Sequence, residues 1–196
     1  MHDLFCIKNG LVFFEGEFRE LDILIEESRI TRIGKRLSGD ENYDAKGCIV
    51  VPGLIDPHVH LREPGAEYKE DFFTGSRAAV AGGFTTVIDM PNNPIPTINV
   101  NRFNEKIALA RKKAICNVLF HFGGTDSNQG EAKKANALSM KIYLGKTTGE
   151  LFLKKSDSLE RHFQTFDGVF VFHASASDGN EREQIGNCLL YTSDAA

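Results

Sequence analysis

Two histidines separated by a single residue, His58 and His60, end the apolar run V-P-G-L-I-D-P-H-V-H and precede L-R-E-P-G. Alternate side chains of a β-strand point to the same face, so the two imidazoles are expected to lie side by side. Neutral imidazoles in that arrangement suit a zinc-like ion. The alternative is a pair of strand histidines whose ring nitrogens are satisfied by backbone carbonyls. The H-x-H spacing alone leaves both interpretations open.

The residues around the pair favour the metal-binding interpretation. A Pro-Gly turn precedes the apolar run, and Arg62 and a second Pro-Gly turn follow the histidines. The pair is therefore expected at the carboxyl end of a strand, where barrel enzymes carry their chemistry. The stretch G-L-I-D-P-H-V-H-L-R-E-P-G resembles the first metal-binding motif of the amidohydrolase superfamily, and H-L-R-E-P-G is similar to the dihydroorotase branch of it. This resemblance implies that His58 and His60 are metal ligands.

Segments of strand and helix character alternate after Gly53. Strands are expected at residues 54–60, 85–90, 115–122, 140–144 and 169–173, and helices at 68–81, 101–113 and 158–166. Such alternation indicates a parallel sheet, either an open doubly wound sheet or a (β/α)8 TIM barrel. No G-x-G-x-x-G or P-loop follows a strand, and the histidine motif favours the barrel. We therefore expect an α/β fold in which residues 53–186 form the first five β/α units of the barrel.

The opening section, residues 1–52, consists of short alternating runs broken at Asn9-Gly10, Glu27-Ser28 and Gly39-Asp40. These breaks are hairpin signals, so we expect a small antiparallel β domain with a structural role. At the other end, residues 187–196 match neither the barrel pattern nor the resemblance, and we interpret them as a tail of doubtful origin.

Lys141 is a lysine flanked by apolar residues in M-K-I-Y-L. An amine held in an apolar site has a lowered pKa and can react with carbon dioxide, giving a carbamate that bridges two metal ions. A lysine in a strand can equally be an edge residue or one whose amine reaches solvent. The K-I-Y segment resembles the family pattern on the fourth strand, which implies that Lys141 is the carboxylated bridge. Lys146, in a polar loop, is expected to be solvated.

Two further strand ends carry candidate residues. The strand G-V-F-V-F-H ends in His173, which the resemblance implies is a third metal-binding histidine, with a satisfied core histidine as the alternative. The second strand ends in D-M-P-N-N-P, which alone indicates a turn. The resemblance implies that Asn92 assists Arg62 in binding the substrate carboxylate. His121 and His162 match no motif and are expected to be structural or exposed.

Together these motifs imply a zinc-dependent cyclic amidohydrolase of the dihydroorotase type, which interconverts N-carbamoyl-L-aspartate and L-dihydroorotate in de novo pyrimidine biosynthesis. Two zinc ions per subunit would be bridged by carboxylated Lys141. No catalytic acid or base is identified, since the proton-transfer aspartate of the family is expected beyond the chain end. The chain is accordingly expected to be truncated and inactive alone. One alternative is an allantoinase or hydantoinase, and Arg62 argues against both of these enzymes. The other is a non-catalytic scaffold, and the intact set of metal ligands argues against it.

Composition limits the other partners. The 196 residues carry a net charge of −4 without a basic cluster, which disfavours nucleic acid and anionic membranes. We therefore expect a small-molecule substrate, with a homo-oligomer possible for the complete protein. The amino-terminal residues lack a signal pattern, and no apolar run reaches membrane-spanning length, so a cytoplasmic location is expected.

The cysteines Cys6, Cys48, Cys116 and Cys188 lack C-x-x-C spacing and are expected to be reduced, buried thiols.

Overall fold

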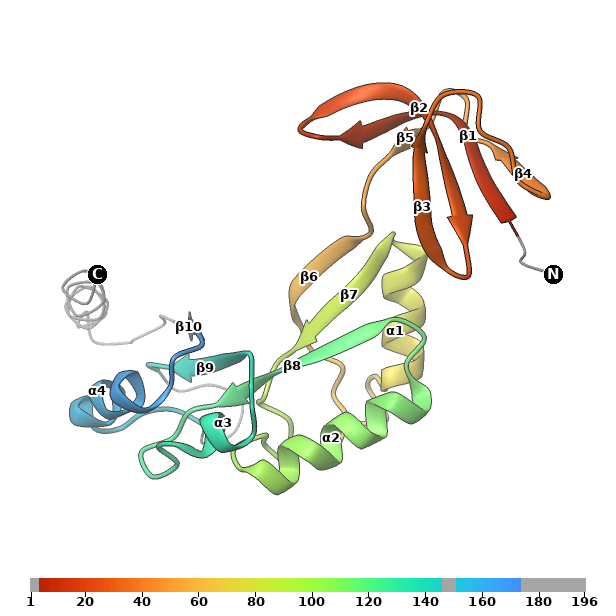
Figure 1. The fold of residues 1–196 in the computed structure, drawn as a ribbon. Coiled ribbons are helices and arrows are strands. Elements are labelled where there is room, and N and C mark those ends of the chain that lie inside the picture. Colours follow the sequence, from red (N-terminus) through yellow and green to blue (C-terminus); the bar gives the residue numbers. More distant parts are fainter. Residues whose placement is uncertain (1–3, 146–150, 174–196) are drawn as a thin grey trace. The chain divides into compact units, whose positions relative to one another are not determined.

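The computed structural model describes residues 4–145 and 151–173 (Figure 1). The chain divides into two compact units, Met1–Gly53 and Leu54–Ala196. Two sequence-based expectations, a solvated Lys146 and a separate tail at residues 187–196, lie outside the described residues, as does Cys188.

The first unit is a mixed β-sheet rather than the purely antiparallel one expected. Strands β1 (Leu4–Phe14), β2 (Glu17–Glu26) and β3 (Arg29–Gly34) form antiparallel pairs. Strands β4 (Glu41–Asp44) and β5 (Ile49–Val50) both pair with β1 in parallel. The sheet order β3-β2-β1-β4 requires the chain to cross from one side of the β1–β2 pair to the other after β3. After this crossover, β4 runs parallel to β1.

One of the expected hairpin turns is a bulge. Asn9-Gly10 lies inside β1, where the pairing with β2 shifts register between Ile7 and Gly10 and Asn9 has a φ of 58°. The strand continues beyond this turn-forming pair because β2 supplies ladder partners on both sides of it. The hairpin turn is at Glu15-Gly16, with φ values of 53° and 84°. The turn expected at Glu27-Ser28 is present, with φ values of 49° and 64°.

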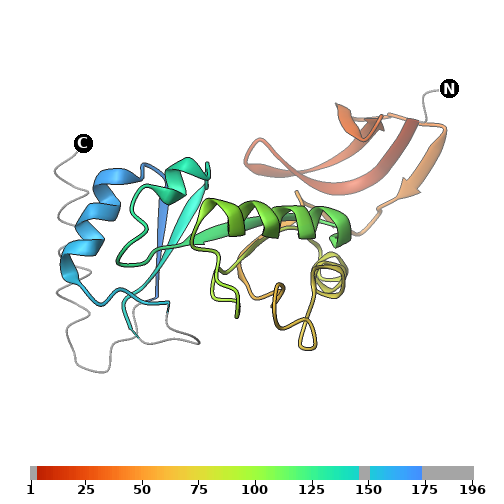
Figure 2. The same cartoon turned by 90° about the horizontal axis from the view of Figure 1, so that it is seen from below.

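The second unit is an α/β structure around a parallel sheet of order β10-β9-β8-β7-β6. Its strands are β6 (Leu54–Val59), β7 (Phe84–Asp89), β8 (Asn117–Gly123), β9 (Ser139–Tyr143) and β10 (Val169–His173), and its helices are α1 (Phe72–Ala81), α2 (Val100–Lys113), α3 (Glu131–Lys134) and α4 (Ser156–Thr165). The sheet curls as half of a barrel, with α1 packed on β7 and α2 on β8 (Figures 1 and 2). The expected partial TIM barrel is confirmed.

Helix α1 begins four residues later than the sequence pattern indicated, at Phe72 instead of residue 68. Asp71 is its N-cap: the carboxylate accepts a hydrogen bond from the Thr74 N–H at 2.8 Å, and the Thr74 hydroxyl oxygen accepts one from the Asp71 N–H at 3.3 Å. This reciprocal capping box defines the helix start. The preceding residues are thereby left as turns at the carboxyl end of β6.

The core of the second unit joins the two long helices to the middle of the sheet. Phe72 of α1 and Phe103 of α2 both contact Phe120 of β8 in edge-to-face geometry, with centroid separations of 5.9 and 6.4 Å. Such ring pairs contribute about 0.5–1.5 kcal/mol beyond their area burial. Ile55 is 63% exposed on β6, an edge strand of the described sheet.

The cysteines are only partly as expected. Cys6 is buried and Cys116 half-buried, but Cys48 is exposed, so the expectation of buried thiols is wrong for Cys48. It lies just before β5, in a short loop rather than in a core strand. Within the described ranges, none of the helices is both long and apolar enough to cross a membrane.

His162 of α4 is completely buried, whereas its place in the helical pattern indicated a polar face. Its Nε2 donates to the Thr125 carbonyl at 2.8 Å, and within residues 4–145 and 151–173 its Nδ1 has no hydrogen-bond partner. Burial lowers the pKa of His162 from the ordinary 6.5, an effect that the Thr125 carbonyl opposes. As the pH falls through 6.5, His162 therefore becomes protonated in the unfolded chain before it does so in the folded protein.

We predict that acidification destabilises the fold in part through His162. Above about pH 7 the group is neutral in both states and contributes no pH dependence; below 6.5 the free energy of unfolding declines by at most about 1.4 kcal/mol per pH unit until the native pKa is reached. The variant His162→Gln keeps a donor for Thr125 but cannot titrate. Its melting temperature should fall less between pH 7.5 and 5.5 than that of the wild type. Parallel losses in the two proteins would contradict this assignment.

Candidate active site

The expected metal ligands lie at one edge of the second sheet. The strands are parallel, so the carboxyl ends of β6, β9 and β10 all lie at the same end of the sheet. The rings of His58 and His60 are 5.5 Å apart between centroids, as the H-x-H spacing predicted, although β6 ends at Val59 and His60 follows the strand. At the far side of the edge, His173 is paired with Tyr143 in the ladder, and their rings are 5.6 Å apart.

The environment of the histidine pair favours neutral imidazoles. Partial burial and the nearby Lys141 ammonium lower the pKa of His58, which His173 lowers further and Asp56 opposes. Burial and Arg62 likewise lower the pKa of His60. A metal ligand must be a deprotonated imidazole, so this environment prepares both rings for coordination.

Lys141 is 2% exposed and lies on β9, which has paired strands on both sides. The edge-strand interpretation therefore does not describe it. Its Nζ donates to the Phe172 carbonyl at 3.2 Å and lies 5.5 Å from the centre of the Tyr143 ring. Burial lowers the pKa of Lys141. A larger fraction of neutral amine makes the reaction with carbon dioxide more favourable.

The four residue types that usually bind metals do not form a site by themselves in the described part of the chain. Among the residues the structure describes, no three side chains of these types converge closely enough to hold an ion. A carbamate on Lys141 is an anionic oxygen ligand that would complete the set with the imidazoles. The buried Tyr143 Oη has no hydrogen-bond partner among the residues that the structure describes. Burial and Asp89 raise the pKa of Tyr143, so its hydroxyl stays a neutral donor. The donor chemistry fits a hydrolytic metal centre.

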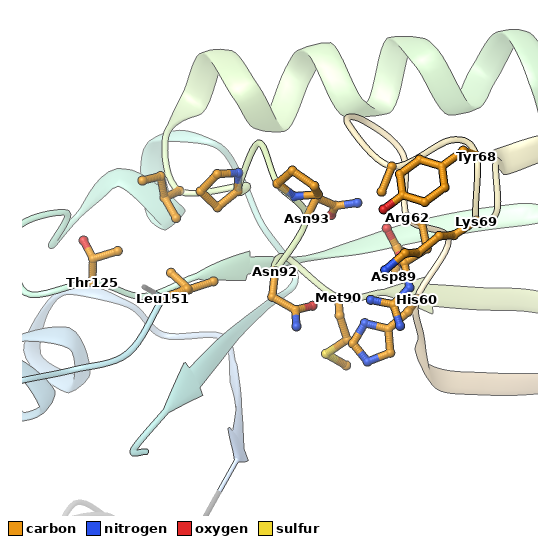
Figure 3. A pocket seen from close by; sticks show the side chains of 14 residues that line it. His60, Arg62, Tyr68, Lys69, Asp89, Met90, Asn92, Asn93, Thr125 and Leu151 are labelled. Carbon is orange, nitrogen blue, oxygen red and sulfur yellow. The ribbon is translucent and has the colours of Figure 1, made fainter. Parts of the chain in front are cut away.

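A cavity of about 490 Å³ opens beside the histidine pair (Figure 3). His60, Arg62 and Asn92 line it, so both expected carboxylate-binding residues share a wall with one of the expected ligands. Asn92 is 9% exposed, and its side chain interacts with His60. Lys69 adds a second cation to the lining. The volume suits a small organic molecule, and the two cations favour an anionic one.

Arg62 adopts a backbone conformation that residues with a side chain rarely take. Its φ is 61°, and the Glu63 N–H donates to the Leu61 carbonyl at 2.7 Å, closing a three-residue turn around it. Such a conformation costs about 1–3 kcal/mol and persists where the surrounding structure enforces it. Sequence patterns did not indicate this strain, because the contacts that enforce it come from other elements.

A buried ion pair beneath the cavity was not anticipated from the sequence. Asp89, at the end of β7, lies 2.6 Å from Lys106 of α2, and both side chains are 1% exposed. Asp89 lines the cavity and accepts a hydrogen bond from the Leu61 N–H at 2.7 Å. Burial lowers the pKa of Lys106, and Asp89 opposes that shift. The available signal was the position of Lys106 on the same helical stripe as Phe103 and Ala110, both buried.

His121 also has a role at this edge. Its Nε2 donates to the Pro57 carbonyl at 2.9 Å, and its Nδ1 accepts from the Ser139 hydroxyl at 2.7 Å. Pro57 lies where the β6–β7 pairing is interrupted, between Asp56 and Val59. The ring therefore supports the backbone immediately before His58, which agrees with the structural role expected for His121.

The fold and this site define the class of protein. The amidohydrolase family model matches residues 49–156, and the chain belongs to the amidohydrolase family. Among its relatives, a dihydroorotase of Methanosarcina mazei is 40% identical over 158 residues, which cover 77% of this chain and 34% of that protein. A dihydroorotase of Lactobacillus helveticus is 44% identical over 195 residues, covering 91% of this chain and 45% of that protein.

Solved structures show the same architecture. An L-hydantoinase (dihydropyrimidinase) from Arthrobacter aurescens superimposes with a TM-score of 0.88 at 25% identity, over 100% of this chain and 51% of that chain. A D-hydantoinase (dihydropyrimidinase) from Thermus sp. gives a TM-score of 0.71 at 26% identity, over 96% and 43% of the two chains. The chain thus spans about a third to a half of the length of these four relatives.

Proposed function

We propose that the intact protein is a metal-dependent dihydroorotase, which interconverts N-carbamoyl-L-aspartate and L-dihydroorotate in pyrimidine biosynthesis. One observation carries the proposal: Arg62 and Asn92 line the same cavity as His60 (Figure 3). A guanidinium with a neighbouring amide is suited to a carboxylate. L-dihydroorotate is a cyclic amide that carries a carboxylate. Its carboxylate suits Arg62 and Asn92, and its amide suits the expected metal ligands.

In this proposal two zinc ions are held by His58, His60, His173 and carboxylated Lys141. When bound, the ions supply Lewis acidity, which activates water and polarises the amide carbonyl. The carbamate contributes the negative charge that neutral imidazoles lack. Its formation is favoured by the burial that lowers the pKa of Lys141.

The polypeptide orients the substrate. Arg62 donates to the carboxylate, and Asn92, which interacts with His60, directs the ring towards the histidine pair. Asp89 is already engaged by Lys106 and the Leu61 N–H, so we do not assign it as the group that moves the proton. Within the described ranges we assign the proton-transfer role to no residue.

The second candidate is a hydantoinase or dihydropyrimidinase, which the structural likeness to the Arthrobacter protein supports. The two candidates differ in the substrate carboxylate. We predict that the intact gene product, supplied with zinc, has a kcat/KM for L-dihydroorotate about 10- to 100-fold above that for 5,6-dihydrouracil, because charged hydrogen bonds contribute about 1.5–3 kcal/mol each. A preference for dihydrouracil or hydantoin would favour the second candidate. Turnover of none of the three would indicate a non-catalytic scaffold.

A further inference from the structure

The ammonium group of Lys106 is bound by three acceptors behind the wall of the cavity. Its Nζ donates to the Met90 carbonyl at 2.9 Å and to Asn93 Oδ1 at 2.6 Å, and it lies 2.6 Å from Asp89 Oδ2. Two of its donors therefore make hydrogen bonds, and Asp89 Oδ2 is its ion-pair partner. All three oxygens belong to one short segment, the end of β7 and the loop that carries Asn92.

The same segment holds the backbone on both sides of Arg62. Asp89 Oδ1 accepts from the Leu61 N–H at 2.7 Å, and Asn93 Nδ2 donates to the Glu63 carbonyl at 3.0 Å. Leu61 and Glu63 are the two neighbours of Arg62 in the chain. One buried ammonium is thus connected, through two side chains, to the residues that flank the strained arginine.

The two consecutive asparagines of this loop, Asn92 and Asn93, have different partners. Asn92 projects on the side of His60, whereas Asn93 projects on the side of α2 (Figure 3). Both asparagines line the cavity, but the Asn93 amide is engaged by Lys106 and the Glu63 carbonyl, whereas the Asn92 side chain interacts with His60. The positive φ of Arg62 has to be enforced by its surroundings, and these contacts bind the backbone of both its neighbours. The Glu63 carboxylate is held separately, by Lys113 and the Phe72 N–H.

We propose that Lys106 is a positioning residue for carboxylate recognition: through Asp89 and Asn93 it fixes Arg62 and Asn92 relative to each other, so that both reach one carboxylate. The inference rests on the proposed function for the identity of the substrate. It goes beyond that proposal because Lys106 lies outside the cavity lining and touches no substrate. A role confined to stabilising the core is the alternative.

The test replaces Lys106 with methionine, which has a similar length and no charge, in the intact zinc-loaded protein. With L-dihydroorotate, Lys106→Met should raise KM about tenfold while kcat changes less than about threefold and zinc content is unchanged, because the interaction lost is one of substrate binding. Lys112→Met, an exposed lysine of the same helix, is the matched control and should leave KM unchanged.

A double-mutant cycle separates positioning from stability. In an Arg62→Met background, Lys106→Met should raise KM by less than about twofold, because the arginine that it positions is gone. A lower melting temperature with unchanged KM, or equal KM effects in both backgrounds, overturns the proposal. The variant Asn93→Ala, made with and without Arg62→Met, provides a second test if Lys106→Met does not fold. Asn93 also lines the cavity, so a positioning role requires its effect on KM to shrink in the Arg62→Met background. Asn93→Ala keeps the ion pair and removes the link to Glu63, so KM should rise about threefold, and an unchanged KM overturns the proposal.

The proposed function and this inference fail in different ways. A wild-type protein that does not turn over L-dihydroorotate contradicts the proposed function, and the inference with it. A wild-type protein that does so, with the same KM in the Lys106 and Asn93 variants, contradicts the inference alone.

Discussion

Replacement of Lys141 by alanine should lower kcat for L-dihydroorotate by about 10³-fold or more in the intact protein, with loss of bound zinc. The expected size follows from the several kilocalories per mole that metal ions contribute to transition-state stabilisation, at about 1.4 kcal/mol for each factor of ten. Lys141 is 2% exposed, and its Nζ donates to the Phe172 backbone carbonyl, so its removal leaves a buried space in the sheet. Activity and zinc content are measured on the same preparation.

Short carboxylic acids should partly restore the Lys141→Ala enzyme. Acetate or propionate can enter the space left by the side chain and supply two carboxylate oxygens in place of the carbamate. Lys112→Ala, on the exposed face of α2, is the matched control and should keep full activity. Retention of both zinc and activity by Lys141→Ala would exclude the bridging role.

Substitution of Arg62 by methionine should raise KM for L-dihydroorotate about 10- to 100-fold, while zinc content remains that of the wild type. The loss corresponds to one or more charged hydrogen bonds of about 1.5–3 kcal/mol each. Arg62 lines the cavity, and the described structure gives it no side-chain ion pair that its removal would break. Arg111→Met, in the last turn of α2, is the control. Equal losses of zinc in the Arg62 and Lys141 variants would contradict the separation of their roles.

The architecture of the second unit was predictable because its signals are local. Apolar runs placed β6 to β10 within a few residues of their observed bounds, and helical stripes predicted helices between them. The start of α1 was missed because the capping box of Asp71 and Thr74 outweighs the helix-like residues before it. Asn9-Gly10 was misjudged because strand pairing by β2 prevailed over a strong local turn preference.

The candidate site was predictable only where a motif carries its own geometry. The spacing of His58 and His60 places their rings together whatever surrounds them. The Asp89–Lys106 ion pair and the contacts to Leu61 and Glu63 join β6, β7 and α2, so no single stretch of sequence shows them. The positive φ of Arg62 is a consequence of these contacts and was equally invisible.

Metal analysis of the intact protein tests the central claim most directly. The protein, purified without chelators, should contain about two zinc ions per chain, the number that a binuclear hydrolytic site holds. Removal of the metal should abolish ring opening of L-dihydroorotate, and added zinc should restore it. His58→Ala should lower the zinc content and the activity together. An active protein without bound metal, or a His58→Ala variant with unchanged zinc and activity, would contradict the account.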